Sequence, residues 1–485
     1  MFQVVFSSII FLFMFLPVTL FVYLIVGRRL RNYFLLFASL VFYAWGETAY
    51  VLIMLLSIIA NWVAGLTIDY FKGRPQAKLF LGFAVAFNLG LLSIFKYANF
   101  IVNNLNAVLS FFELPTMALQ PVHLPIGISF FTFQAMSYVI DIYRRDAVVQ
   151  CHPVNIGLYI ALFPQLIAGP IVRFHDIAAQ ITHRHVSFQD FGEGVERFII
   201  GLGKKVLIAN QVAVVSDQVF ALEAGALSPG IAWLGVLCYT LQIYFDFSGY
   251  SDMAIGLGRM FGFRFLENFN YPYIAKSVRE FWRRWHISLS SWFRDYLYIS
   301  LGGSRRGNLR TYLNLLTVFF LCGLWHGASW NFVVWGLLHG FFLVIERLGF
   351  EKLLARLWVP LRHFYVLFVV MITWVFFRVD TISAAIGYLA VMFGQAQGGT
   401  SPVTLMQIGR DSQTAIIAGI IFSAPVFSWL NRARLAVSSN GYPKMSTIFD
   451  GMAGAMKAVG LSLVLYLSIL FVSSGAYNPF IYFRF

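Results

Sequence analysis

Apolar stretches long enough to cross a lipid bilayer recur along the whole chain of 485 residues. A helix needs about 20 predominantly apolar residues to span the hydrocarbon core. Because lipid offers no partner to backbone polar groups, spanning segments must pair those groups internally, as helices do. The sequence therefore predicts an all-α, polytopic integral membrane protein. The expected spans or partial spans cover residues 2–26, 33–45, 48–68, 79–95, 99–112, 192–216, 231–261, 311–348, 363–378, 383–393, 414–430 and 459–474.

The composition excludes an ordinary soluble enzyme. Hydrophobic residues make up 59% of the chain and charged residues only 12%, whereas soluble domains carry about 25% charged residues. The formal net charge is +14, and the basic residues lie between apolar spans. This distribution favours contact with membrane lipids and argues against nucleic-acid binding. Arg28, Arg29 and Arg31 follow the first span, so we expect that span to be uncleaved, with its N-terminus outside.

Two apolar runs, residues 124–145 and 162–174, are interrupted by Pro, Gly and polar groups. Non-helical backbone at membrane depth is tolerated only where protein covers it or where it lines a wet cavity. Residues 173–191 are polar and contain His175, His183 and His185. No clustered acidic or cysteine partner accompanies these histidines, so we expect a solvated loop and no metal site.

The tripeptide Trp325-His326-Gly327 lies in an apolar run, residues 318–340, whose titratable side chains other than Cys322 are two histidines. Ionisable groups at bilayer depth are costly, and they usually face a bundle interior or a water-filled cavity and mark a functional path. The alternative is a histidine that is satisfied by one neighbouring helix carbonyl. The context favours function.

A second segment, residues 279–310, interleaves arginines with aromatic residues and contains His286. Arg with Trp and Tyr is typical of an interfacial helix at the headgroup boundary, and such a helix could also dip into the bundle and place His286 inside. A third segment, residues 242–258, carries Asp246 and Asp252 among small and aromatic residues. These carboxylates either pack helices together or form the wall of a cavity.

Two imidazoles in different elements could converge in a membrane cavity. Haem or metal coordination would require further ligands, and a proton relay would require a chain of ionisable groups through the spans. General base catalysis needs only one imidazole within hydrogen-bond reach of a hydroxyl, with a second polar group to position it. Catalysis therefore fits best. A proton-coupled transporter or flippase and a scaffold for an export complex remain alternatives.

Three blocks taken together resemble the membrane-bound O-acyltransferase family. They are QIYFDFSGYSDMAIG, FWRRWHISLSSWFRDYLYISLGG and LCGLWHGASWNFVVWGLLHG. The resemblance extends over nearly the whole chain, and the LGGSRRG sequence favours the branch that O-acetylates exopolysaccharides over the D-alanyl branch. It implies roughly a dozen transmembrane and partly re-entrant helices around a central funnel. It also implies a single domain over residues 1–485, with a catalytic core at about residues 124–348.

The resemblance further implies a function for this chain. It would be an O-acetyltransferase of the bacterial inner membrane that binds no cofactor and uses acetyl-CoA or a similar acyl donor from the cytoplasmic side. His326 would be the general base, and His286 would be the second catalytic residue. The acetyl group would pass to a periplasmic partner of the SGNH-hydrolase type and then to a polysaccharide, with alginate as the first candidate. Peptidoglycan acylation and D-alanyl transfer by the same fold are the alternatives. The side chains expected to contact substrate are Arg283, Arg284, Trp285, Trp325, Asp246 and Ser290.

Overall fold

The computed structural model describes residues 6–395, 408–426, 428–430, 432, 443–475, 477–479 and 481. Within these ranges the regular elements are all helices, which confirms the expected all-α class. Shorter apolar helices cover Phe11–Ile25 and Ile382–Met392. The expected spans at 2–26 and 414–430 lie partly outside the described residues. Among the described residues, 7 helices are long and apolar enough to cross a membrane: Val51–Tyr70, Pro75–Phe111, Phe188–Phe220, Pro229–Met260, Trp330–Arg356, Val359–Arg378 and Gly451–Ser473.

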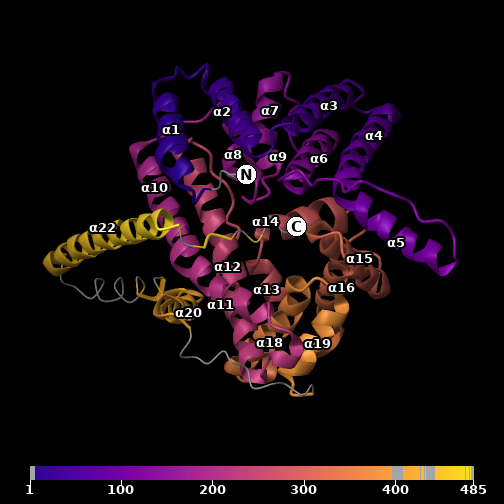
Figure 1. Cartoon of the computed structure of the whole chain (residues 1–485). Coiled ribbons are helices and arrows are strands. Elements are labelled where there is room, and N and C mark those ends of the chain that lie inside the picture. The colour runs from indigo at the N-terminus through magenta and orange to yellow at the C-terminus, as the bar shows by residue number, and fades with distance from the viewer. Residues whose placement is uncertain are drawn as a thin grey trace.

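The first third of the chain forms a layer of helices at the top of Figure 1. The expected span at 79–95 continues into the next one, because α4 and α5 are joined through the π-helical turn η2 (Ser93–Tyr97). The helices of this layer are α1 (Leu16–Ile25), α2 (Arg31–Gly46), α3 (Val51–Tyr70), α4 (Pro75–Leu92), α5 (Ala98–Phe111), α6 (Ile128–Arg144), α7 (Pro153–Ala161), α8 (Phe163–Leu166) and α9 (Phe174–Thr182).

Close glycine contacts hold the central helices together. Helix α10 (Phe188–Gly203) leads through η3 (Lys204–Ala209) into α11 (Asn210–Phe220), and both helices pack along α12 (Pro229–Met260). A Cβ atom on Gly201 would lie 2.5 Å from the carbonyl oxygen of Gly249. Small residues allow such close backbone approach between membrane helices.

The prediction of one interfacial helix over residues 279–310 is wrong, because the segment is not a single helix. The segment instead makes two short helices, α13 (Val278–Arg284) and α14 (Ile287–Trp292), followed by η6 (Phe293–Tyr298). Its aromatic side chains are mostly buried, and Trp292 stacks on Phe133 of α6 with ring centroids 3.8 Å apart. Burial of such large aromatic rings against other helices stabilises the bundle. The alternative position, with His286 inside the bundle, is confirmed.

The last third closes the bundle beside α13 (Figure 1). The run at 311–348 forms a hairpin of two helices, α15 and α16, as expected. Helix α22 extends away from the rest of the molecule in Figure 1. The helices of this part are α15 (Asn308–His326), α16 (Trp330–Ile345), η7 (Glu346–Phe350), α17 (Glu351–Arg356), α18 (Val359–Arg378), α19 (Ile382–Met392), α20 (Arg410–Phe422) and α22 (Pro443–Ser473).

Residues 173–191 are not a solvated loop throughout. They begin with helix α9, in which Phe174, Ile177 and Ile181 are buried. The spacing of these three apolar residues follows one helical face, and the polar residues between them occupy the other face. The segment therefore packs against the bundle.

The α15–α16 hairpin generates a prediction about stability. A Cβ atom on Gly336 would overlap the carbonyl oxygen of Phe319 in α15, so we expect Gly336→Ala to force the two helices apart and to cost about 1–3 kcal/mol. Gly90 in α4 has nothing near its Cβ position. Gly90→Ala should therefore leave the stability unchanged or raise it slightly. Thermal unfolding of both variants in detergent measures the difference, and equal unfolding temperatures would contradict the tight hairpin.

Candidate functional site

His326 is the last residue of α15. The chain turns through Gly327, Ala328 and Ser329 before α16 begins at Trp330. Gly327 has no room for a side chain, because a Cβ atom there would overlap the ring of Phe332. The short turn and the glycine contacts between the two helices therefore fix the position of His326 at the closed end of the hairpin.

The imidazole of His326 lies in an aromatic enclosure. Its ring centroid is 4.9 Å from that of Trp335 and 5.3 Å from that of Phe377, both in edge-to-face orientation. The residue is only 5% exposed. Neither Nδ1 nor Nε2 has a hydrogen-bond partner among the described residues. Because buried polar atoms are normally paired, such an imidazole is available to a ligand.

Lys96 holds the end of α15 in place. Its Nζ donates to the carbonyl oxygen of Trp325 and, at 3.4 Å, to that of His326. The hydroxyl of Tyr97 donates to the carbonyl of Leu324 at 2.8 Å. The last carbonyls of a helix have no partner within the helix, so η2 supplies partners to three consecutive carbonyls. Sequence reasoning missed Lys96, although a lone lysine between two apolar spans is itself a signal.

His286 lies in the break between α13 and α14. Its backbone is left-handed, with φ 43° and ψ 54°, a conformation that is costly for a residue with a Cβ. Asn268 stabilises this turn, because its carbonyl accepts from the amide of Ile287 at 2.9 Å. The Asn268 side chain also contacts His286 Nδ1 at 3.2 Å. Sequence reasoning missed Asn268, and nothing in its sequence context marks it.

The structure brings the two predicted histidines to the same aromatic residue. The ring of Trp325 lies 6.1 Å from that of His286 and 5.0 Å from that of His326, measured between centroids. The two imidazoles therefore pack on one shared ring from two different elements. His286 is fully buried, and its Nε2 has no partner among the described residues. The site therefore contains two buried imidazoles with free ring nitrogens.

A cavity of about 490 Å³ reaches the turn that follows His326. Lys96 and Gly327 form part of its wall, and Asn99 and Asn103 of α5 line it further out. Arg378 also lines the cavity, where it pairs with Asp217 at 2.8 Å. The lining is thus polar, with hydrogen-bond donors and acceptors close to the catalytic candidate.

The other predicted substrate contacts have different surroundings. Asp246 is buried, pairs with Lys205 at 2.6 Å and accepts from the amide of Ile481 at 2.9 Å. Its carboxylate therefore holds Ile481 against α12. Arg283 is exposed, and Arg284 pairs with Glu280 at 2.8 Å.

Of the two remaining candidates, Trp285 lies between α13 and α14, and Ser290 lies in α14. Trp285 is buried against Phe281, with ring centroids 5.5 Å apart. Ser290 donates to the carbonyl of Trp285 at 3.4 Å. Of the six predicted contacts, Trp325 is the one whose ring touches both histidines.

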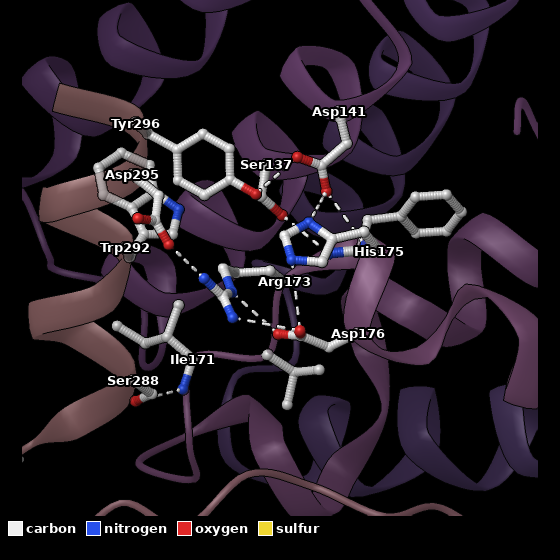
Figure 2. Close-up of polar contacts among 12 residues, drawn as sticks. Ser137, Asp141, Ile171, Arg173, His175, Asp176, Ser288, Trp292, Asp295 and Tyr296 are labelled. Carbon is white, nitrogen blue, oxygen red and sulfur yellow. Dashed lines mark hydrogen bonds and ion pairs between the residues drawn. The ribbon is translucent and has the colours of Figure 1, made fainter. Parts of the chain in front are cut away.

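A separate polar network ties the interrupted run at 162–174 to its neighbours (Figure 2). His175 Nδ1 lies 3.0 Å from Asp141, and its Nε2 lies 3.3 Å from Asp176. Arg173 bridges Asp176 at 2.9 Å and Asp295 at 2.5 Å. The hydrogen bonds to Asp141 and Asp176 raise the pKa of His175 to about 10. His183 and His185 are exposed.

Comparison with known proteins places this geometry in context. The model of the MBOAT, membrane-bound O-acyltransferase family matches residues 37–379. The chain is 42% identical to a probable alginate O-acetylase of Pseudomonas putida, over 99% of this chain and 100% of the relative. It is 47% identical to a probable alginate O-acetylase of Pseudomonas aeruginosa, over 80% and 75% of the two chains. It is 33% identical to a peptidoglycan O-acetyltransferase of Helicobacter pylori, over 100% and 98%.

The contacts of Lys96 lead to a second prediction. Lys96→Met removes the donor to the carbonyls of Trp325 and His326, and each buried carbonyl left unpaired costs about 1–3 kcal/mol. Tyr97→Phe removes a single hydrogen bond at the same helix end and should cost less. We expect faster amide hydrogen exchange at residues 324–330 in Lys96→Met, measured by mass spectrometry. Exchange no faster than in Tyr97→Phe would contradict the role of Lys96.

The ion pairs of His175 predict a dependence of stability on pH. The pKa of His175 is raised from 6.5 to about 10 in the folded state, so its protonated form stabilises the fold. This contribution is complete below pH 6.5, declines as the pH rises, and is lost above about pH 10. Unfolding curves of the wild type and of His175→Gln should therefore converge as the pH rises through this window. A constant difference, or convergence at low pH, would contradict this account, and His183→Gln serves as the exposed control.

Proposed function

The chain belongs to the membrane-bound O-acyltransferase family and is an acyltransferase, and on this premise we propose that it O-acetylates an exopolysaccharide with His326 as the general base. The observation that carries the proposal is the imidazole of His326, which is buried with both ring nitrogens unpaired among the described residues. His326 directly precedes Gly327, Ala328 and Ser329, which line the cavity. A general base must reach the proton that it takes directly.

The chemistry requires one proton acceptor and an activated acyl group. His326 takes the proton of the acceptor hydroxyl while the hydroxyl oxygen forms a bond to the acyl carbon of a thioester. The carbon–sulfur bond then breaks, and the leaving thiolate takes the proton from the imidazolium. His326 returns to its starting state, so a single imidazole completes the cycle. The aromatic residues around it exclude bulk water, which would otherwise compete for the acyl group.

The distribution of basic residues supports one orientation of the chain in the membrane. Arg28 and Arg29 precede α2, and Arg31 is its first residue. Lys72 and Arg74 lie between α3 and α4, and Lys78 lies in the first turn of α4. The loop at 113–123, beyond the other end of the α4–α5 pair, contains neither lysine nor arginine. By the positive-inside rule, the basic end is cytoplasmic. The chain would then lie in the bacterial inner membrane, with its acyl donor, acetyl-CoA or a similar thioester, on the basic side.

The cavity beside His326 lies towards the opposite end. Leu124, at the end of the loop that lacks basic residues, lines it together with Asn99 and Asn103. We therefore propose that the acceptor hydroxyl enters from the periplasm through this cavity. The acetyl group would leave by the same route to a periplasmic SGNH-hydrolase-type partner.

The relatives support acetyl as the acyl group and a cell-surface polymer as its destination. Two of them are described as probable alginate O-acetylases and one as a peptidoglycan O-acetyltransferase. Alginate is the first candidate, because the match to the probable alginate O-acetylase of Pseudomonas putida is full-length at 42% identity. Peptidoglycan is the second candidate.

The function predicts a specific loss. His326→Gln should reduce O-acetylation of the polymer by about 10²–10⁴-fold, the usual contribution of a general base. The O-acetyl content of both the secreted polysaccharide and the peptidoglycan, measured in a strain that carries only the variant, shows which polymer is affected. His183→Gln changes an exposed histidine and serves as the control.

The same experiment separates the alternatives. Polymer export and the amount of the protein in the membrane should stay at wild-type levels in His326→Gln. Normal acetylation in that variant would exclude His326 as the base. Loss of export with unchanged acetylation of the remaining polymer would favour a transporter.

A further inference from the structure

Asn268 holds the turn at His286 through its side-chain oxygen. Asn268 Oδ1 lies 3.2 Å from the backbone nitrogen of Ser288, 2.9 Å from the Ser288 hydroxyl and 3.2 Å from His286 Nδ1. Both Asn268 and Ser288 are buried. Three potential donors therefore converge on one amide oxygen.

The directions of these hydrogen bonds follow from the groups involved. A backbone N–H can only donate, so the atom of Asn268 that faces the amide of Ser288 must be the oxygen. The amide of Ile171 donates to the Ser288 hydroxyl oxygen at 2.9 Å (Figure 2). The hydroxyl proton of Ser288 is then available to Asn268 Oδ1. The Ser288 hydroxyl oxygen also lies 3.5 Å from His286 Nδ1, but its proton goes to Asn268 Oδ1 at the shorter distance of 2.9 Å. The amide oxygen has no proton to give, so His286 Nδ1 is the donor in its contact with Asn268.

The proton on Nδ1 determines the state of the other ring nitrogen of His286, Nε2. A neutral imidazole carries one proton, and when Nδ1 holds it, Nε2 presents a lone pair. Nε2 of His286 is buried without a partner among the described residues. The rings that pack on His286 are Phe247 of α12, at 4.6 Å, and Trp325 of α15, at 6.1 Å. The ring of Trp325 also packs on His326, at 5.0 Å.

His286 and His326 therefore differ in what fixes their protons. The contact with Asn268 sets the tautomer of His286. Neither ring nitrogen of His326 is hydrogen-bonded to a described residue. An imidazole whose tautomer is set by a neighbour is pre-organised for one hydrogen-bonding role. For His286 that role is to accept at Nε2.

We propose that Asn268 is a positioning residue that keeps the proton of His286 on Nδ1, so that Nε2 accepts a hydrogen bond from an N–H or O–H group of the bound substrate. This inference rests on the proposed acyl transfer for its substrate part. The group cannot be the hydroxyl that His326 deprotonates, because that hydroxyl has one proton to give. It is either a second polar hydrogen of the acceptor or an amide N–H of the acyl donor.

The tautomer is measured without any assay of activity. In the full chain labelled with ¹⁵N-histidine in lipid bilayers, the difference between the spectra of the wild type and His286→Gln isolates the two nitrogens of His286. We expect a protonated Nδ1 and an unprotonated Nε2. A proton on Nε2 would overturn the assignment to Asn268, whether or not the chain transfers acetyl groups.

Asn268→Asp provides the functional arm. An aspartate keeps an acceptor oxygen for Ser288 and His286, but its negative charge favours the protonated imidazole. The acid limb of the pH–rate profile for transfer from [¹⁴C]acetyl-CoA by membrane vesicles should therefore move up by about 1–3 pH units. Asn308→Asp changes an exposed asparagine at the start of α15 and should leave the profile unchanged. An unshifted profile in Asn268→Asp would show that Asn268 is merely structural.

Two replacements of His286 test the use of Nε2. Glutamine can place its amide oxygen near the position of Nε2, whereas asparagine reaches only the position of Nδ1. We expect His286→Gln to retain at least ten times the activity of His286→Asn. A raised KM for acetyl-CoA in His286→Asn would identify the donor as the source of the hydrogen bond, and a lowered kcat at unchanged KM would identify the acceptor. Equal activities of the two variants would overturn the role of Nε2. Wild-type vesicles without transfer would contradict the proposed donor while the tautomer measurement still stands.

Discussion

The structure depends on a helix that ends in the interior of an apolar bundle. Helix α15 stops at His326, and its last carbonyls have no partners within the helix. In a membrane, such groups must be satisfied by protein. Lys96 and Tyr97 of η2 donate hydrogen bonds to these carbonyls. Lys96 and Trp325 are 229 residues apart in the sequence. This contact allows the chain to turn at Gly327 and to leave an imidazole at the turn. The same lysine lines the cavity next to this turn, so one side chain holds the helix end and forms part of the cavity wall.

The second histidine depends on a different device. The backbone of His286 is left-handed, and Asn268 accepts four hydrogen bonds around that turn, one at its backbone carbonyl and three at its side-chain oxygen. A strained conformation persists only where its surroundings hold it firmly. Both catalytic candidates thus lie at interruptions of helices, and both interruptions are held by polar residues from elsewhere in the chain. The ring of Trp325 packs against both imidazoles and sets their relative position.

The sequence predicted the all-α membrane fold and the two histidines because apolar runs and buried ionisable groups are local signals. It did not reveal Lys96 or Asn268 as partners, since their roles come from contacts with residues distant in the chain. The prediction of a single helix over residues 279–310 failed for a related reason. Arginines and aromatics are typical of a single interfacial helix, but the segment is broken at His286, and Trp285 and Trp292 pack on Trp374 and Phe133 of other helices. The segment that contains Asp246 is polar enough to form a cavity wall. The carboxylate of Asp246, however, forms an ion pair with Lys205 and accepts a hydrogen bond from the amide of Ile481.

In the proposed mechanism the acyl carbon reacts next to His326, and one structure can test this position. The measurement is a cryo-electron microscopy structure of the full chain in a lipid nanodisc with a non-hydrolysable acetyl thioester analogue of acetyl-CoA. The account predicts that the acyl group lies beside Trp325, with room for a hydroxyl within hydrogen-bond reach of the His326 imidazole, at about 2.6–3.2 Å. An analogue bound with its acyl group away from both His286 and His326 would contradict it.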